Sequence, residues 1–209
     1  MDAKDFERTL NEVYKPEPDE GALRQAQVRL TQTLANEKAS AILYTRFEHP
    51  LIAIICLAIR NNKLIAIDFG ISADAFVARI EKQFGVAPYW AIDELIQIEN
   101  QVRAYLNGER QTFDIPVDIS QLTDFQRQVL FATRQVPRGQ IATYMDIARK
   151  IGNPKAVRAV GQALGRNPIP IVIPCHRVIA SNGSLGGYSG GGGLETKAKL
   201  LQLEGAQLI

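Results

Sequence analysis

Cysteine and histidine are scarce in this chain, which has two of each among 209 residues. Two thiols cannot build a disulfide framework, so the sequence favours a reducing compartment. Two cysteines and two histidines scattered along the chain also argue against a structural zinc site. Cys56 lies within an apolar run and is expected to be a core residue. Cys175 and His176 are adjacent and are therefore the pair to explain.

Long hydrophobic runs are also missing. The longest run, residues 51–59, is far shorter than the roughly 20 residues that a membrane-spanning helix needs. The first five residues carry mixed charges and no apolar region follows them, so no targeting signal is predicted. We expect a cytoplasmic protein with no membrane partner. Its content of 46% hydrophobic and 22% charged residues is ordinary for a globular protein of one large or two small domains.

The net charge of +2 is unevenly distributed. Residues 121–209 contain 11 lysines and arginines against 4 acidic residues, a net charge of +7, whereas residues 1–120 carry −5. A basic C-terminal part is what binding to nucleic-acid phosphates requires. A basic surface that is merely solvated has the same composition, so charge alone leaves nucleic-acid binding open.

Residues 1–118 predict a helical extension followed by an α/β region. Residues 1–36 have two amphipathic helical patterns interrupted by a break at residues 15–21, and we expect two surface helices packed on the body, with partner binding as the alternative. The α/β region shows strand patterns and helical spacing, with a hairpin turn at Asn61-Asn62. Its predicted strands are residues 41–47, 51–59, 63–69 and 113–117, and its predicted helices are residues 74–84 and 92–106.

From Thr123 the pattern becomes helical and compact. Thr123 and Gln126 fit a capping box for a helix ending near residue 135. Thr143 can cap a second helix over residues 144–151, and Asn153 a third, with Pro154 at its first position. Two short helices joined by a tight glycine-containing turn predict a helix-turn-helix, although any helical hairpin fits the same pattern.

The third predicted helix has two distinct faces. Val157, Val160 and Leu164 share the face expected to point inward, while the outward face has long polar side chains. The outward residues are Lys155, Arg158 and Gln162. Small residues at 156, 159, 161 and 163 keep this helix thin, so it can enter a narrow groove.

Residues 167–177 contain the pattern that points to chemistry, Asn-Pro-Ile-Pro-Ile-Val-Ile-Pro-Cys-His-Arg. The β-branched run 171–173 predicts a short strand that ends at Pro174, since proline has no backbone donor. Cys175 would then lie at a strand end, and the adjacent His176 can favour the nucleophilic thiolate. A buried structural cysteine beside an ordinary histidine is the alternative.

Four motifs together resemble the O6-alkylguanine-DNA alkyltransferases from about residue 125 to residue 204. They are Thr143-Tyr144, Asn-Pro-Lys-Ala-Val-Arg-Ala-Val-Gly at 153–161, Pro-Cys-His-Arg-Val at 174–178 and Gly-Tyr-Ser-Gly-Gly at 187–191. The resemblance implies a suicide repair protein that moves an alkyl group from damaged guanine onto its own cysteine. It also implies a ribonuclease H-like α/β domain with a small antiparallel sheet, followed by a mainly helical, winged helix-turn-helix-like domain. The domains are expected at 37–119 and 120–209, after the extension 1–36.

The resemblance assigns the catalytic roles. Cys175 is the acceptor, and Glu204 orients and polarises His176, which takes the thiol proton through a water. Asn167 tethers the loop that carries the cysteine. Tyr144 pushes on the target phosphate and helps to neutralise the departing guanine. No metal or cofactor is implied.

The resemblance also assigns the DNA-binding and pocket residues. Arg158 enters from the minor groove and fills the space left by the flipped nucleotide. The other residues expected at the DNA are Tyr144, Asn153, Ala156, Ala159, Gly161 and Ser181. The guanine pocket is expected to involve Pro170, Val178, Tyr188 and Ser189. The loop 181–193 has four consecutive glycines at 190–193 where the family pattern has two, so it leaves the shape of the pocket open.

Two other classes of protein deserve comparison. A damage sensor or DNA-binding regulator of the same fold would carry another residue in place of Cys175, so the intact cysteine argues against it. A Cys-His hydrolase would need a direct dyad, whereas adjacent residues of an extended segment point to opposite sides. The resemblance implies that the partner is duplex DNA that contains O6-alkylguanine, and also O4-alkylthymine, and that the protein is a monomer.

Overall fold

The computed structural model describes residue 4, residue 21, residues 23–30 and residues 41–207. The chain divides into two compact units, residues 1–40 and residues 41–209. In the first unit the described residues are helical, and Leu23, Val28 and Leu30 are exposed. The rest of the helices predicted over residues 1–36 lies outside the described residues. Within the described part of the chain, no helix has both the length and the apolar character needed to cross a membrane.

The second unit begins with a four-stranded sheet in the order β3-β2-β1-β4. Three long strands, β1 (Ile42–His49), β2 (Ala53–Arg60) and β3 (Lys63–Phe69), pair antiparallel as predicted. Asn61 and Asn62 both have positive φ angles, 53° and 57°, which is the conformation of a tight hairpin turn. The short strand β4 (Tyr89–Trp90) pairs parallel to β1, so the complete sheet is mixed.

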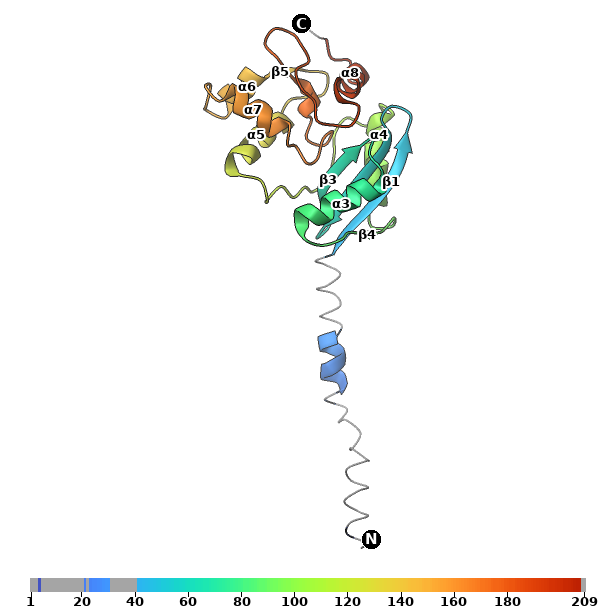
Figure 1. Ribbon diagram of the computed structural model, residues 1–209. Helices are drawn as coiled ribbons and strands as arrows, with labels where there is room; N and C mark the ends of the chain where they lie inside the picture. Colours follow the sequence, from blue (N-terminus) through green and yellow to red (C-terminus); the bar gives the residue numbers. More distant parts are fainter. Residues whose placement is uncertain (1–3, 5–20, 22, 31–40, 208–209) are drawn as a thin grey trace. The chain divides into compact units, whose positions relative to one another are not determined.

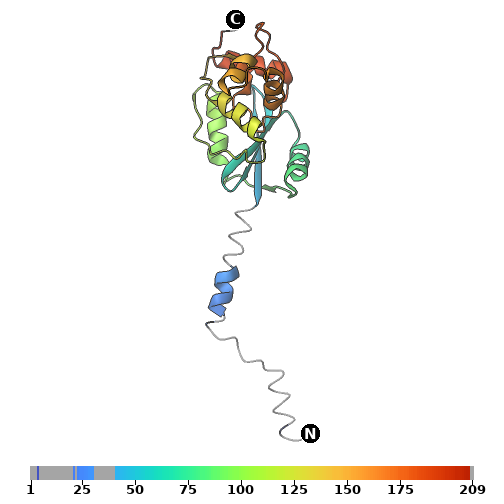
Figure 2. The same ribbon diagram turned by 90° about the vertical axis from the view of Figure 1, so that its left-hand side faces the viewer.

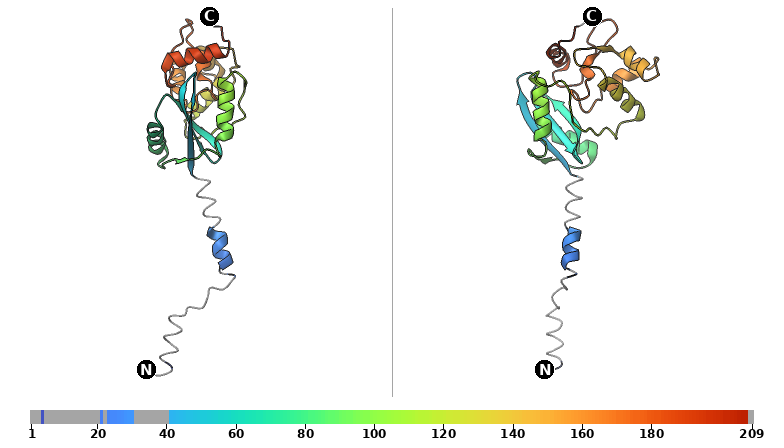
Figure 3. Two further views of the ribbon diagram at one scale, coloured as in Figure 1. Left: turned by 90° about the vertical axis from the view of Figure 1, so that its right-hand side faces the viewer. Right: turned by 180° about the vertical axis from the view of Figure 1, so that it is seen from behind.

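One helix covers each face of this sheet (Figure 2 and Figure 3, left). Helix α3 (Ala73–Phe84) is capped by the Ser72 side chain and ends at Gly85, whose φ of 73° satisfies a left-handed C-cap. Its buried residues, Phe76 and Ile80, pack on β2 and β3. Helix α4 (Ile96–Leu106) lies on the opposite face.

The prediction of a strand over residues 113–117 is wrong. Val117 makes only an isolated bridge to Leu64. Leu64 donates to the Pro116 carbonyl at 2.8 Å and accepts from the Asp118 amide at 2.9 Å. Pro116 has no backbone donor of its own, so this segment cannot continue a ladder.

The C-terminal part contains the three predicted helices. They are α5 (Asp124–Arg134), α6 (Tyr144–Lys150) and α7 (Val157–Leu164). The predicted caps of the first two helices are confirmed, because Thr123 with Gln126 and Thr143 with Asp146 form complete capping boxes. The predicted start of the third helix is wrong. The Asn153 carbonyl accepts a hydrogen bond from the Ala156 amide at 3.0 Å, so Asn153 begins a turn that precedes the helix. The N-cap residue is Ala156.

The strand predicted over residues 171–173 is also wrong. Residues 171 and 172 form a turn, Ile171 has a φ of 72°, and the only pairing is an isolated bridge between Pro170 and Ile173. The three β-branched residues are buried in the hydrophobic core, since each is at most 4% exposed. Cys175 therefore begins a single 3-10 turn, η1 (Cys175–Arg177), and does not follow a strand.

After η1 the chain adds a short strand next to the start of α6 and then forms the last helix, which lies beside the sheet domain (Figure 1). Strand β6 (Val178–Ile179) pairs parallel with β5 (Ala142–Thr143), the strand directly before α6. A glycine-rich loop leads to the last helix, α8 (Gly193–Leu203). The larger hydrophobic cluster is continuous from the sheet to η1 and α8, so the two parts share one core.

Candidate active site

Cys175 is held by a tight turn stabilised by Asn167. The Asn167 side-chain amide donates to the Ile173 carbonyl at 2.8 Å and to the Cys175 sulfur at 3.2 Å. Its side-chain oxygen accepts from the Ile169 amide at 3.1 Å. One buried asparagine thus fixes both ends of the turn and contacts the sulfur, in line with its predicted tethering role.

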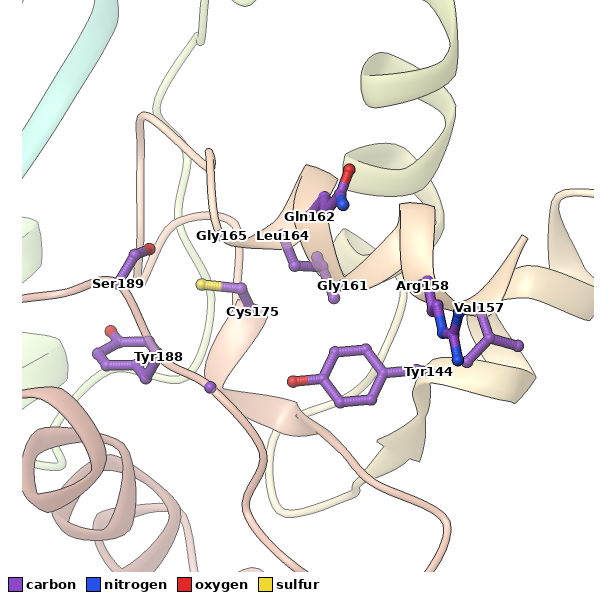
Figure 4. Close-up of a pocket in the computed structure, with 11 residues that line it drawn as sticks. Tyr144, Val157, Arg158, Gly161, Gln162, Leu164, Gly165, Cys175, Tyr188 and Ser189 are labelled. Atoms are coloured by element: carbon purple, nitrogen blue, oxygen red, sulfur yellow. The ribbon is translucent and has the colours of Figure 1, made fainter.

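The Cys175 side chain borders a cavity of about 660 Å³ (Figure 4). This volume is within the range of roughly 300–1,000 Å³ typical of small-molecule sites. Tyr188 and Ser189 lie at one end of the cavity, and Val157 and Arg158 at the other. The remaining lining residues are Tyr144, Gly161, Gln162, Leu164, Gly165 and Gly187.

Tyr144 points into this cavity from the first position of α6 (Figure 4). The Thr143 capping box determines where the helix begins and therefore where the ring is placed. A Cβ atom at Gly186 would come within 2.6 Å of the Tyr144 hydroxyl, so only glycine fits there. Burial raises the pKa of Tyr144, so its hydroxyl remains protonated and can donate.

His176 and Glu204 form a fully buried pair. His176 Nε2 lies 2.9 Å from Glu204 Oε1. A carboxylate only accepts hydrogen bonds, so Nε2 carries the hydrogen and Nδ1 is left as an acceptor. Within the described residues Nδ1 is buried without a hydrogen-bond partner. A buried polar atom of this kind is a suitable site for a bridging water.

The surroundings determine the protonation of these groups. Burial raises the pKa of the Cys175 thiol, while the hydrogen bond from Asn167 and the charge of Lys197 act in the opposite direction. Burial lowers the pKa of His176, and Glu204 only partly opposes this effect. Both Cys175 and His176 are therefore uncharged at rest. Formation of a thiolate at Cys175 would therefore require that another group take up the thiol proton.

Glu204 stays ionised in spite of its burial. Burial opposes its charged form, but hydrogen bonds from His176 and Arg177 outweigh this effect and lower its pKa well below the usual range. Arg177 donates twice, from Nε to Oε2 at 2.8 Å and from Nη2 to Oε1 at 2.9 Å. This forked geometry is the strongest form of an arginine–carboxylate contact.

The two predicted faces of α7 are confirmed in part. Arg158 and Gln162 are exposed and Val160 and Leu164 are buried, whereas Val157, predicted to point inward, is half-buried and lines the cavity. Lys155 is exposed but lies in the turn before the helix. The Gly161 Cα faces the Tyr144 ring, since a Cβ there would lie 3.8 Å from it. Ala156 and Ala159 are half-buried, and Asn153 and Ser181 are exposed.

Two residues predicted for the pocket lie elsewhere. Pro170 and Val178 are buried and do not line the cavity, whereas Tyr188 and Ser189 do. Val178 is fully enclosed in β6, and Pro170 bridges to Ile173 in the turn before Cys175. Both support the Cys175 segment from within the core. The described residues contain no group of three or more histidine, cysteine or acidic side chains that could hold a metal ion.

Comparison with known proteins identifies the family. Residues 42–119 match the model of the 6-O-methylguanine DNA methyltransferase ribonuclease-like domain, and residues 124–206 match that of its DNA-binding domain. A methylated-DNA–protein-cysteine methyltransferase of Haemophilus influenzae is 37% identical over 170 residues, which cover 79% of this chain and 87% of the relative. The chain belongs to the 6-O-methylguanine DNA methyltransferase family. The family resemblance read from the motifs is thus confirmed, as is the fold class.

Further members of the family agree with this assignment. The methylated-DNA–protein-cysteine methyltransferase of Methanosarcina acetivorans is 44% identical over 128 residues, covering 60% of this chain and 80% of the relative. The crystal structure of Mycobacterium tuberculosis OGT in complex with DNA superposes with a TM-score of 0.66 at 34% identity, covering 78% of this chain and 92% of the solved chain.

Among the residues of this methyltransferase-family site that sequence reasoning missed are Tyr105, Lys197 and Gly186. Tyr105 contacts Glu204 and His176 from α4. Lys197 is fully buried in α8, and its ammonium donates to the carbonyls of Val178 and Leu185 at 2.6 and 2.5 Å. Gly186 makes room for Tyr144. An acidic residue at a helix end drew attention to Glu204, but no local pattern distinguishes Tyr105 or Lys197 from ordinary helix residues.

Proposed function

We propose that this protein repairs duplex DNA by transferring an alkyl group from O6-alkylguanine to Cys175, once per chain. The observation that carries the proposal is the placement of Cys175. Its sulfur is held by Asn167 beside a buried His176–Glu204 pair and borders a cavity large enough for an extruded base. We propose O4-alkylthymine as a second substrate of the same site. We further propose that the protein acts as a monomer in the cytoplasm, where its two free thiols would stay reduced.

The reaction would begin with extrusion of the damaged nucleotide, which costs a few kcal/mol. Arg158 is exposed at the mouth of the cavity and would fill the gap in the base stack, while Tyr144 would contact the target phosphate and then the base. The outer face of α7 would lie against the DNA, with Asn153, Ala156, Ala159, Gly161 and Ser181 near it. Tyr188 and Ser189 would form one wall around the base.

The chemical step would be an in-line displacement at the alkyl carbon. The Cys175 proton passes through a water to Nδ1 of His176, and the sulfur forms a bond to the alkyl carbon as the carbon–O6 bond breaks. The electron pair of that bond leaves with guanine, and the Tyr144 hydroxyl helps to neutralise it. Glu204 stabilises the imidazolium that forms. The thioether product has no leaving group that water can displace, so the protein would act once.

The alternative is a damage sensor that binds the lesion without reacting. The thiol at the cavity wall favours transfer over sensing, because a sensor needs no nucleophile there. The experiment is mass spectrometry of the intact protein mixed with duplex DNA that contains O6-methylguanine. We expect one added CH₂ group per chain, mapped to Cys175 and absent from Cys175→Ala, with Cys56→Ala as the matched control that still reacts. Modification of Cys56, or many turnovers per chain, would overturn the proposal.

A further inference from the structure

Tyr105 belongs to the sheet domain but reaches the centre of the active site. It lies near the end of α4 and is fully buried. Its hydroxyl donates to Glu204 Oε1 and lies 3.4 Å from His176 Nε2. The hydroxyl therefore flanks the hydrogen bond between the two residues. Figure 3 (left) shows the end of α4 directly beside α8, the helix that precedes Glu204.

The Tyr105 ring is held on two sides. The ring of Phe113 packs against it with centroids 4.9 Å apart. The Arg138 guanidinium lies 5.1 Å from the centre of the Tyr105 ring, and its two ends donate to the carbonyls of Arg110 and Leu203 at 2.9 Å. A ring fixed in this way places its hydroxyl in one position. Such rigidity is what a group needs in order to orient another side chain.

The hydroxyl remains a donor at every working pH. Burial raises the pKa of Tyr105 strongly, and the negative charge of Glu204 raises it further. Glu204 Oε1 accordingly accepts from three groups, namely Tyr105, His176 and Arg177. His176 and Arg177 belong to the same turn as Cys175, whereas Tyr105 approaches from the other domain.

We propose that Tyr105 is a positioning residue for alkyl transfer, which holds Glu204 and His176 in the arrangement that removes the Cys175 proton. The sheet domain then contributes to the chemistry as well as to the scaffold. This inference rests on the proposed function of the site. The other titratable or charged groups around Cys175 and His176 are Tyr144 from α6, Arg177 from η1, Lys197 and Glu204 from α8 and its end, and Tyr188 from the loop.

A Tyr105→Phe variant of the full chain tests the inference. The change keeps the ring between Phe113 and Arg138 and removes only the hydroxyl. Tyr44→Phe is the matched control, because Tyr44 packs on Phe76 and Trp90 in the same domain and contacts no residue of the site. Two rates are measured across pH for each protein, namely methyl transfer from O6-methylguanine DNA and carboxamidomethylation of Cys175 by iodoacetamide. The second rate reports the thiol without any guanine chemistry.

We expect Tyr105→Phe to slow both reactions about tenfold near neutral pH, which corresponds to about 1.4 kcal/mol. The deficit should shrink in alkaline buffer, where the thiol ionises without help from His176. A double variant with Glu204→Gln should lose no more than Glu204→Gln alone, since Tyr105 acts through that carboxylate. Tyr44→Phe should match the unaltered protein in both profiles.

Three results would overturn the inference. They are an unchanged pH profile in Tyr105→Phe, a loss equal to that of Tyr44→Phe, and a pH-independent loss that follows the decrease in thermal stability. If Tyr105→Phe does not fold, transfer is measured on protein that carries fluorotyrosine at position 105 alone, because Tyr144 and Tyr188 line the cavity and have to stay unaltered. A rate profile that fluorination leaves unchanged would then refute the role. Failure of the proposed function looks different, because the unaltered protein would react with iodoacetamide and not with O6-methylguanine DNA.

Discussion

Glu204 is the residue on which the polar groups of the site converge. It is fully buried in its side chain and accepts from His176, Arg177 and Tyr105. Its place after the end of α8 is one that the helix dipole disfavours for an anion. The hydrogen bonds from His176, Arg177 and Tyr105 outweigh that cost and hold the carboxylate in its charged form.

We predict that Glu204→Gln slows alkyl transfer near neutral pH and that the rate partly recovers in alkaline buffer. Glu204 raises the pKa of His176 by its hydrogen bond and its charge, so without that charge the imidazole accepts the Cys175 proton less readily. Arg177 also loses its buried partner, which should lower the free energy of unfolding by roughly 3 kcal/mol. Glu195→Gln, an exposed change in the same helix, is the control. We expect the DNA affinity of Glu204→Gln to stay nearly constant. A pH–rate profile like that of the unaltered protein would show that the carboxylate has no role in transfer.

We predict that Arg158→Ala impairs repair of duplex DNA far more than reaction with free O6-benzylguanine. A side chain that fills the space of a flipped nucleotide matters only when a stack is opened. Lys155→Ala is the control, because Lys155 is an exposed cation in the turn just before α7. Loss of one phosphate contact should lower the salt dependence of DNA binding, as the slope of log affinity against log salt, by about one unit. Equal losses of Arg158→Ala on both substrates, measured as single-turnover rates, would contradict the wedge role.

At the scale of secondary structure, helix starts and the glycine loop determine where the site residues lie. Two helices begin with the same capping box, but only α6 places a cavity residue at its first position. The glycine loop is fixed on both sides. Gly186 lies against Tyr144, and Gly191 lies against the end of β3.

Removing the two caps should separate stability from activity. Thr143→Ala and Thr123→Ala each lose a capping hydrogen bond and should each lower the free energy of unfolding by about 1 kcal/mol. Only Thr143→Ala should also slow transfer, because Tyr144 directly follows it. Urea denaturation and transfer rates of the two variants make the comparison. Equal transfer rates in both variants would show that the cap does not position the tyrosine.

The glycine loop gives a second prediction at this scale. A Cβ atom at Gly191 would come within 1.9 Å of the Phe69 carbonyl oxygen, so Gly191→Ala must displace the loop. A Cβ atom at Gly193 would meet no atom within 4 Å, so Gly193→Ala should cost only the strain of alanine in a left-handed backbone conformation, about 1–2 kcal/mol of folding free energy. We expect Gly191→Ala to slow transfer more than Gly193→Ala, since Tyr188 and Ser189 belong to the displaced wall. Similar rates for the two variants would mean that the contact with β3 does not shape the pocket.

At the scale of the whole second unit, the sheet and the helical part behave as one body. The larger hydrophobic cluster includes Leu57 and Ile67 from the sheet, Val160 from α7 and Leu200 from α8. The Ile67 amide also donates to the Pro168 carbonyl at 2.9 Å, which ties β3 to the segment before Cys175. Two matched family domains therefore share one core.

We predict that residues 41–207 unfold in a single cooperative transition. A core shared by both parts leaves neither with a complete hydrophobic interior of its own. Calorimetry should give equal calorimetric and van't Hoff enthalpies for this transition, and near-UV and far-UV circular dichroism should coincide. Two separated transitions would show that the sheet domain and the helical domain are independent.

Local patterns in the sequence were enough to predict much of this protein. Segments rich in Ile and Leu predicted the three long strands, and Asn61-Asn62 predicted the hairpin, because both depend on neighbouring residues only. The capping boxes at Thr123 and Thr143 have the same local origin. The contiguous motif around Cys175 was specific enough to indicate the family, which the comparison then confirmed.

Tertiary structure decided the rest. The run Ile171–Ile173 has strand composition, yet the Asn167 side chain and the surrounding core hold it as a turn, so propensity yields to burial. The support of His176 depends on Tyr105 and Glu204, which are 99 residues apart, and no local pattern connects them. The protonation of Cys175 likewise follows from its burial, which outweighs the opposing effects of Asn167 and of Lys197 on α8. The sequence alone predicted Cys175 as the nucleophile, whereas the surroundings of its thiol exist only once distant segments pack together.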